Sequence, residues 1–161
     1  MDVTATRSRG KRPHVADLAA GAAAGVAATG LMSAVMVVAK QAGLLGQQPP
    51  ERIAEAGLDA ANVARSEGAQ DALATVLHFG FGAVGGAGYR IVRRIVPKPR
   101  SWLVPGVAYG LAIWLVSYKG WIPRLGILPP PARDRPGRPT VMIAAHVVYG
   151  VVLGRLAEPR R

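Results

Sequence analysis

The fold is decided by a stretch near the end of the chain, which reads AAHVVYGVVLG at residues 144–154. This otherwise apolar run contains one histidine, with a tyrosine and a glycine three and four residues after it and a second glycine four residues further on, as on one face of a helix: His146, Tyr149, Gly150 and Gly154. A related stretch, HFGFGAVGG, occurs at residues 78–86 and begins with His78. Neither pattern is the signature of a chemical reaction. Together they predict two lipid-compatible helices that each carry one imidazole and a pair of small residues.

Four long runs without charged side chains separate the polar parts of the chain. An apolar helix of about 20 residues, rising about 1.5 Å per residue, crosses a hydrocarbon core about 30 Å thick. The first run follows a basic N-terminus, as in a cleaved signal peptide, but its 22 uncharged residues make it long for one. The sequence therefore predicts an all-α, four-span transmembrane bundle, with spans at about residues 18–40, 72–92, 102–119 and 140–157.

The spans define one domain at residues 18–157, between a basic N-terminal segment at residues 1–17 and a short tail at residues 158–161. After the pair Pro49-Pro50, residues 51–66 predict a short amphipathic helix. Its apolar face is weak, being mostly Ala and Gly. It is compatible with a helix at the membrane surface or against the bundle, and equally with a solvated loop helix.

The charged residues lie in clusters between the uncharged runs. The chain of 161 residues has 20 Lys and Arg against 9 Asp and Glu, a formal net charge of +11. A basic soluble domain would spread these charges along its helices, so their clustering argues against a nucleic-acid partner. The absence of cysteine excludes disulfides, zinc fingers, iron–sulfur sites and covalently attached haem.

The distribution of basic residues predicts the orientation in the membrane. With four spans, both termini lie on the same side, and 12 of the 20 Lys and Arg fall on that side. The positive-inside rule then places both termini in the cytoplasm, where the basic clusters meet anionic lipids. The expected location is a bacterial cytoplasmic (inner) membrane.

Each predicted span carries two glycines four residues apart, a spacing that lets transmembrane helices approach closely. The helix-packing pairs are Gly21/Gly25, Gly82/Gly86, Gly106/Gly110 and Gly150/Gly154. The spans also align with each other: the first matches the third at an offset of 80 residues, and the second matches the fourth at an offset of 68. This alignment predicts two copies of one helical hairpin, related by an axis along the membrane normal.

Several short motifs resemble those of the YagU-like bacterial inner-membrane proteins. They lie at residues 45–53, 78–82, 109–114, 120–130 and 145–154. The resemblance covers residues 18–157. It implies a four-span fold and a bacterial membrane location, and it implies no chemistry because that family is a domain of unknown function.

The two histidines are the leading candidates for a polar site. Each lies six residues inside its span on helices of the same direction, so both imidazoles should lie roughly 9 Å below the outer boundary. Ionisable groups inside a membrane are candidates for function. Three interpretations remain open: hydrogen bonds to neighbouring helices through Tyr109 or Tyr149, paired ligands for haem or a metal, and a proton or substrate relay.

The relay lacks an acidic partner, because the spans contain no internal Asp or Glu and Asp17 and Asp71 lie at span edges. Trp114, in the middle of the third span, favours packing over ligand stacking. The sequence holds no Ser-His-Asp, paired-carboxylate or phosphate-cradling pattern, so it gives no signature of an enzyme.

Two classes of function follow. The first is a small structural or interaction protein of the membrane, acting as a homo-oligomer or as a subunit of a larger complex. The second is a transporter-like or cofactor-binding protein that uses the histidines. A polar-lined cavity would favour the second class, and a dry bundle sealed by glycines would favour the first.

Overall fold

The computed structural model describes residues 15–63, 66–96 and 101–157. Within these ranges the chain is helical and contains no strand, which confirms the all-α prediction for them. The elements are α1 (Val15–Gln41), α2 (Pro49–Ala60), α3 (Glu67–Ile95), α4 (Leu103–Val116), the π-helix η1 (Ser117–Trp121), α5 (Ile122–Arg124), the 3-10 helix η2 (Pro131–Arg133) and α6 (Arg138–Ala157). Most of the predicted N-terminal segment and the whole C-terminal tail lie outside the described residues.

Three helices are long and apolar enough to cross a membrane: α1, α3 and α6. They correspond to the first, second and fourth predicted spans, and their length and composition are those of helices in a membrane protein. The helix α4 has 14 residues, which is about 21 Å at about 1.5 Å per residue and short of a hydrocarbon core of about 30 Å. It continues without a break through η1 and α5 to Arg124.

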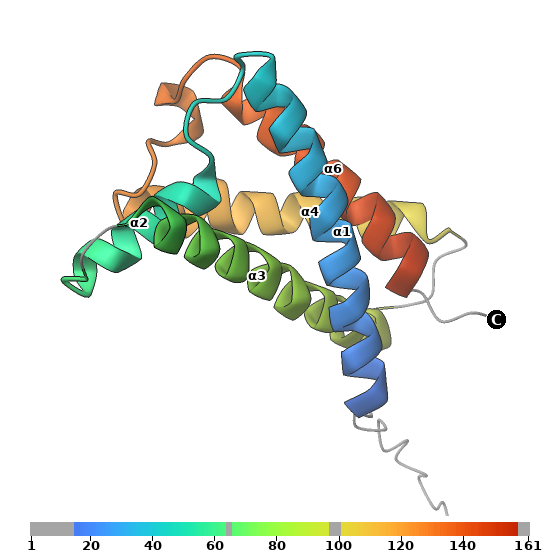
Figure 1. Cartoon of the computed structure of the whole chain (residues 1–161). Helices are drawn as coiled ribbons and strands as arrows, with labels where there is room; N and C mark the ends of the chain where they lie inside the picture. Colours follow the sequence, from blue (N-terminus) through green and yellow to red (C-terminus); the bar gives the residue numbers. More distant parts are fainter. Residues whose placement is uncertain (1–14, 64–65, 97–100, 158–161) are drawn as a thin grey trace, which may run out of the picture.

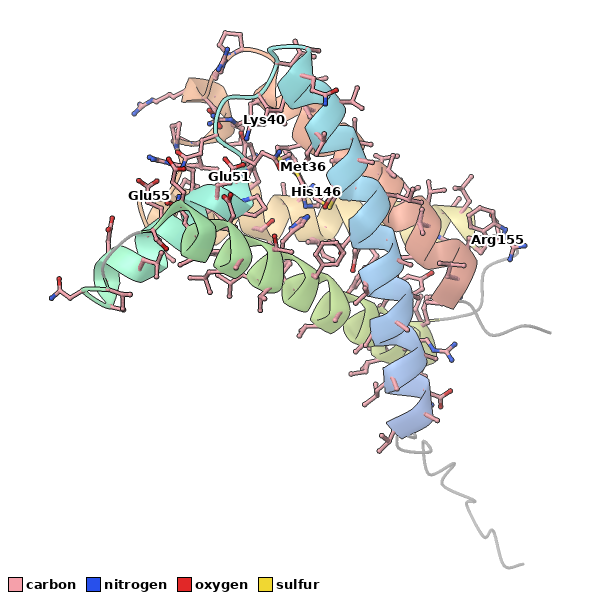
Figure 2. All side chains as sticks on the ribbon, in the orientation of Figure 1. Met36, Lys40, Glu51, Glu55, His146 and Arg155 are labelled. Atoms are coloured by element: carbon pink, nitrogen blue, oxygen red, sulfur yellow. The ribbon has the colours of Figure 1, made fainter. Side chains whose placement is uncertain are left out.

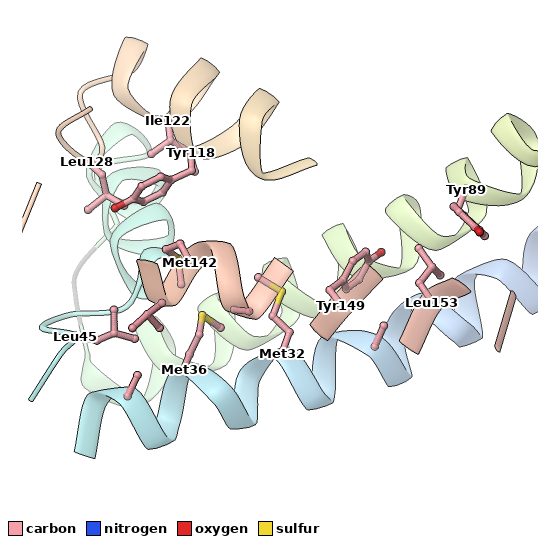
Figure 3. Close-up of a cluster of buried hydrophobic side chains, with 14 of the residues drawn as sticks. Met32, Met36, Leu45, Tyr89, Tyr118, Ile122, Leu128, Met142, Tyr149 and Leu153 are labelled. Carbon is pink, nitrogen blue, oxygen red and sulfur yellow. The ribbon is translucent and has the colours of Figure 1, made fainter. Parts of the chain in front are cut away.

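The long helices cross one another as a fan (Figure 1), with α1 packed against both α3 and α6, and α4 packed against α6. By contrast, α3 touches α6 only briefly and has no extended contact with α4. Figure 3 shows Met32 and Met36 rising from α1 toward α6 in the apolar core. The core continues along α6 through Met142, Tyr149 and Leu153.

The short amphipathic helix ends earlier than the sequence predicts. The helix α2 stops at Ala60, and Asn62 adopts a left-handed conformation with φ of 54°, as residues that terminate helices often do. Ser66, predicted as its last residue, instead caps α3: its hydroxyl accepts a hydrogen bond from the amide of Ala69 at 3.3 Å. The helix α2 packs against α3.

One basic side chain ties three helices together at the end where α1 begins and α3 and α6 finish. Arg90 of α3 lies 3.3 Å from the carboxylate of Asp17 in α1, and it donates a hydrogen bond to the carbonyl oxygen of Ala157 at 2.7 Å. Arg94 also pairs with Asp17. A cation is favourable at the last carbonyls of a helix, so Arg90 joins the start of α1 to the end of α6.

Candidate functional site

The predicted glycine pairs lie at two helix crossings. At the first crossing, a Cβ atom added to Gly25 of α1 would overlap the carbonyl oxygen of Gly82 in α3, and one added to Gly86 would overlap that of Gly21. Thr29 completes this contact, because its hydroxyl donates to the carbonyl oxygen of Gly25 at 2.8 Å and occupies the space beside Gly82. The backbones of α1 and α3 therefore touch without intervening side chains.

The second crossing joins α4 and α6 in the same way. A Cβ on Gly150 would overlap the carbonyl oxygen of Gly106, and one on Gly110 would overlap that of His146. Gly154 faces the carbonyl oxygen of Trp102, which would lie 2.6 Å from an added Cβ. The backbones of the two helices are therefore in direct contact at each crossing, α1 with α3 and α4 with α6.

A cavity of about 250 Å³ lies between these two helix pairs. Both histidines line it, His78 from α3 and His146 from α6, although they are 68 positions apart in the chain. Figure 2 shows the His146 side chain in the interior of the bundle, near Met36. The wall is mostly apolar and comes from all the major helices; its other members are Thr29, Met32, Met36, Pro49, Pro50, Ile53, Leu77, Phe81, Gly82, Ile113, Ser117, Tyr118, Trp121, Ile122, Met142 and Tyr149.

The two histidines have different hydrogen-bond partners. His78 Nε2 lies 3.1 Å from the hydroxyl oxygen of Ser33 in α1. His146 uses Nδ1, which lies 2.8 Å from the carbonyl oxygen of Met142 in the preceding turn of α6. Among the described residues, neither ring is hydrogen-bonded to the other or to a tyrosine.

The candidate tyrosines bond to the backbone of α3. Tyr149 donates to the carbonyl oxygen of Gly82 at 2.9 Å, and Tyr109 donates to that of Gly85 at 2.8 Å. Glycines make room for both hydroxyl groups, since an added Cβ would lie 2.7 Å from the Tyr149 hydroxyl at Gly85 and 2.8 Å from the Tyr109 hydroxyl at Gly88. Tyr149 lines the cavity, whereas Tyr109 lies outside it and packs edge-on against Tyr89.

A π-helical turn forms one wall of the cavity. The segment η1 contributes Ser117, Tyr118 and Trp121. Turns of this kind are rare and occur often at functional sites, because the wider ring redirects side chains and frees backbone groups. Trp114, just before η1, does not line the cavity; it stacks on Tyr118 with ring centroids 6.2 Å apart.

A buried carboxylate is bonded to one residue of the cavity wall, Tyr118, and the sequence did not predict it. Asp134 lies in the connector before α6, and its side chain is 1% exposed. It accepts a hydrogen bond from the hydroxyl of Tyr118, and Arg138 lies 2.7 Å away. Arg138 and Arg135 also reach the carbonyl oxygens of Gln47 and Gly43, which fastens the connector to the loop after α1.

The arrangement offers polar groups for a small ligand but no evident metal site. The described residues contain no group of three or more His, Cys, Asp or Glu side chains that could hold a metal ion. The carboxylate of Asp134 faces Tyr118 and Arg138, and it is not among the residues that line the cavity. The geometry is that of an apolar pocket with a few convergent polar groups, which is typical of small-molecule sites.

Separate partners for the two histidines predict independent effects on stability. Each of His78→Ala and His146→Ala removes one hydrogen bond, with a net cost of about 0.5–1.5 kcal/mol. In the empty protein the double variant should lose the sum of the two, within about 0.5 kcal/mol. Unfolding of the three variants in detergent measures this. A double variant no less stable than either single one would instead indicate a single site that needs both rings.

The comparisons with known proteins identify a family without a known activity. No curated protein and no solved structure matches the chain. None of the comparisons links it to the YagU-like proteins specifically. A protein-family model described as a family of unknown function, DUF6789, matches residues 15–159. This match covers nearly the whole chain, and the protein therefore belongs to the DUF6789 family.

Proposed function

We propose that this protein is a four-span integral membrane protein that binds a small molecule in the cavity between its two helix pairs. The observation that carries the proposal is the shared cavity: His78 and His146 line one space of about 250 Å³. The π-helical wall supports the same conclusion. A cavity at the interface of two halves is where transporter-like membrane proteins hold their substrates, so a transport role is the natural extension of binding.

The remaining span of the proposed four, third in chain order, is the helical segment from α4 to α5. It runs unbroken from Leu103 to Arg124, and α4 contacts α6 through the same kind of glycine crossing that joins α1 to α3. The segment is longer than the predicted span at residues 102–119.

The two crossings support a common origin of the halves, with a register different from the one read in the sequence. Gly25 contacts Gly82 and Gly86 as Gly106 contacts Gly150 and Gly154. Gly82 and Gly86 of α3 correspond to Gly150 and Gly154 of α6 at an offset of 68 residues. With these pairs aligned, Gly25 of α1 corresponds to Gly106 of α4, an offset of 81 residues instead of the 80 predicted from the sequence. Near the helix ends, the glycines of positive φ, Gly43 and Gly126, match at 83. The offset thus grows from 81 to 83, so the second half has two additional residues between Gly106 and Gly126. This stretch contains η1, and a π-helical turn accommodates inserted residues within a helix.

The proposed topology has both termini in the cytoplasm of a bacterium. The contact of Arg90 with Asp17 and Ala157 supports the shared side of the two chain ends. Since the protein has no cysteine, single cysteines report the side of each segment. Ala132→Cys should react with an impermeant maleimide added to intact cells, and Ser8→Cys should react only after the cells are opened. The reverse pattern would contradict the topology.

A structural or interaction role is the second candidate, favoured by the two backbone-contact crossings. Leu77→Trp separates the two candidates, because Leu77 lines the cavity and is 42% exposed, so a larger side chain there can fill the opening without unfolding the bundle. Protein extracted with its native lipids should carry a bound small molecule in the wild type and lose it in Leu77→Trp. Absorbance and metal analysis of the same samples test haem and metal ions. Wild-type protein without any enriched small molecule, chromophore or metal would refute ligand binding and leave the structural role.

A further inference from the structure

We propose that the cavity selects a neutral, mainly apolar molecule that carries an O–H or N–H donor, and that His146 Nε2 accepts the hydrogen bond from it. This inference rests on the proposed function, because it names the chemical class of the ligand in the same cavity.

The hydrogen bond of His146 determines which ring nitrogen is free. A carbonyl oxygen can only accept, so the 2.8 Å contact with Met142 requires the proton on Nδ1. In the neutral imidazole, Nε2 is then an acceptor. The described residues supply no donor to it, although the side chain is only 8% exposed. Nε2 keeps some accessible surface, so a donor on a ligand in the cavity can reach it and pair with a lone pair that no described residue uses.

The hydroxyl groups in the wall are also committed as donors. Each of the four gives its proton to a protein acceptor, which leaves only oxygen lone pairs facing the cavity. The donor and acceptor pairs are Thr29 to the Gly25 carbonyl, Ser117 to the Ile113 carbonyl, Tyr118 to the Asp134 carboxylate and Tyr149 to the Gly82 carbonyl. Among the described wall residues, the donors left for a ligand are the indole N–H of Trp121 and, in one tautomer, a ring N–H of His78. A ligand donor has more partners, because the lone pairs of the four hydroxyl groups and of His146 Nε2 can accept from it.

The absence of charge in the wall excludes ionic ligands. Within the part of the chain that the structure describes, no Asp, Glu, Lys or Arg side chain lines the cavity. A charged molecule would lose its hydration there without gaining a counter-ion, which is strongly unfavourable. The methionines Met32, Met36 and Met142 instead offer flexible, polarisable surface for an apolar body.

The opening of the cavity faces the region that lipid would occupy. Leu77 and Phe81 of α3 both line the cavity, yet they are 42% and 49% exposed. Because these two lining side chains are themselves exposed, we place the opening at this part of α3, on a face that lipid would cover. The cavity volume of about 250 Å³ is suited to a small molecule.

The test compares 4-bromophenol, which has a donor, with 4-bromoanisole, in which a methyl group replaces the donor proton. Bromine quenches tryptophan fluorescence, and Trp121 lines the cavity. The background variant Trp102→Phe/Trp114→Phe leaves Trp121 as the single reporter. In lipid nanodiscs at neutral pH, the phenol should quench saturably and bind about 3- to 10-fold more tightly than the ether, which is the worth of one net hydrogen bond.

The variant His146→Ala should abolish this preference while both compounds still bind, and His146→Gln, which keeps an acceptor, should restore part of it. A preference unchanged in His146→Ala would overturn the assignment to His146. Saturable quenching with equal affinities in the background variant would overturn the ligand class but leave the binding function standing. Quenching that rises linearly for both compounds would overturn the binding function as well. The comparison of the two compounds needs no His146 variant, so it tests the ligand class and the binding function even if those variants do not fold.

Discussion

Replacing Asp134 with alanine is expected to lower the free energy of unfolding by about 3–5 kcal/mol. That is the usual cost of removing one partner from a buried ion pair, because the other charge is left behind without compensation. Here the remaining charge is Arg138, whose side chain is 10% exposed. The change also removes the acceptor of the Tyr118 hydroxyl and loosens the contact between the connector and the loop after α1.

Two variants calibrate this result in SDS-induced or thermal unfolding in detergent. Tyr118→Phe removes only the hydroxyl donor to Asp134 and should cost about 0.5–1.5 kcal/mol. Lys40→Ala breaks an exposed pair with Glu51, in which the Lys40 side chain is 47% exposed, and should cost less than about 1 kcal/mol. If Asp134→Ala were no more destabilising than Lys40→Ala, the connector would not be held by this carboxylate.

Replacing Gly150 with alanine should destabilise the protein by about 1–3 kcal/mol, the cost typical of overpacking. An added methyl group would overlap the carbonyl oxygen of Gly106 and lie 2.9 Å from the Cα atom of Val107. These are backbone atoms, so the contact can be relieved only by moving α4 away from α6. Gly150→Leu should have a larger effect and should change the elution of the protein in detergent.

The chain offers matched controls, since Gly30 in α1 and Gly80 in α3 would meet nothing within 4 Å of an added Cβ. Alanine at either position should stabilise the protein by up to about 1 kcal/mol, because glycine is a poor helix former. The melting temperature should therefore fall for Gly150→Ala and rise for the two control variants. Equal melting temperatures for Gly150→Ala, Gly30→Ala and Gly80→Ala would mean that the α4–α6 crossing is not close.

The sequence was sufficient to predict that the long helices exist, because a long apolar helix depends on local composition. The uncharged runs predicted α1, α3 and α6, where the apolar character extends over the whole length of the helix. It was less informative about the ends of elements. Ser66 is compatible with the last turn of α2 and with the cap of α3, and only the left-handed backbone at Asn62 decides between them.

The cavity could only partly be predicted. The spacing within each helix placed both histidines at similar depth, and they do line one cavity. Their partners could not be predicted, because Ser33 lies 45 residues from His78 and is an ordinary polar residue in an apolar run. The π-helical turn has no periodicity signal in the sequence. Asp134 stands among arginines in a Pro-rich connector, where composition alone indicates a solvated loop.

The central claim is that His78 and His146, from the two halves of the chain, face the same cavity. The most direct measurement is intramolecular cross-linking of His78→Cys/His146→Cys with dibromobimane, which becomes strongly fluorescent only when both of its ends have reacted with thiols. The control pair Val76→Cys/Ile143→Cys lies on the same two helices, with side chains 67% and 38% exposed and outside the cavity. We expect the histidine-position pair to give a fluorescent monomer and the control pair to react at each site without being bridged. Absence of the bridged monomer, with both single-cysteine variants reactive, would contradict the shared cavity.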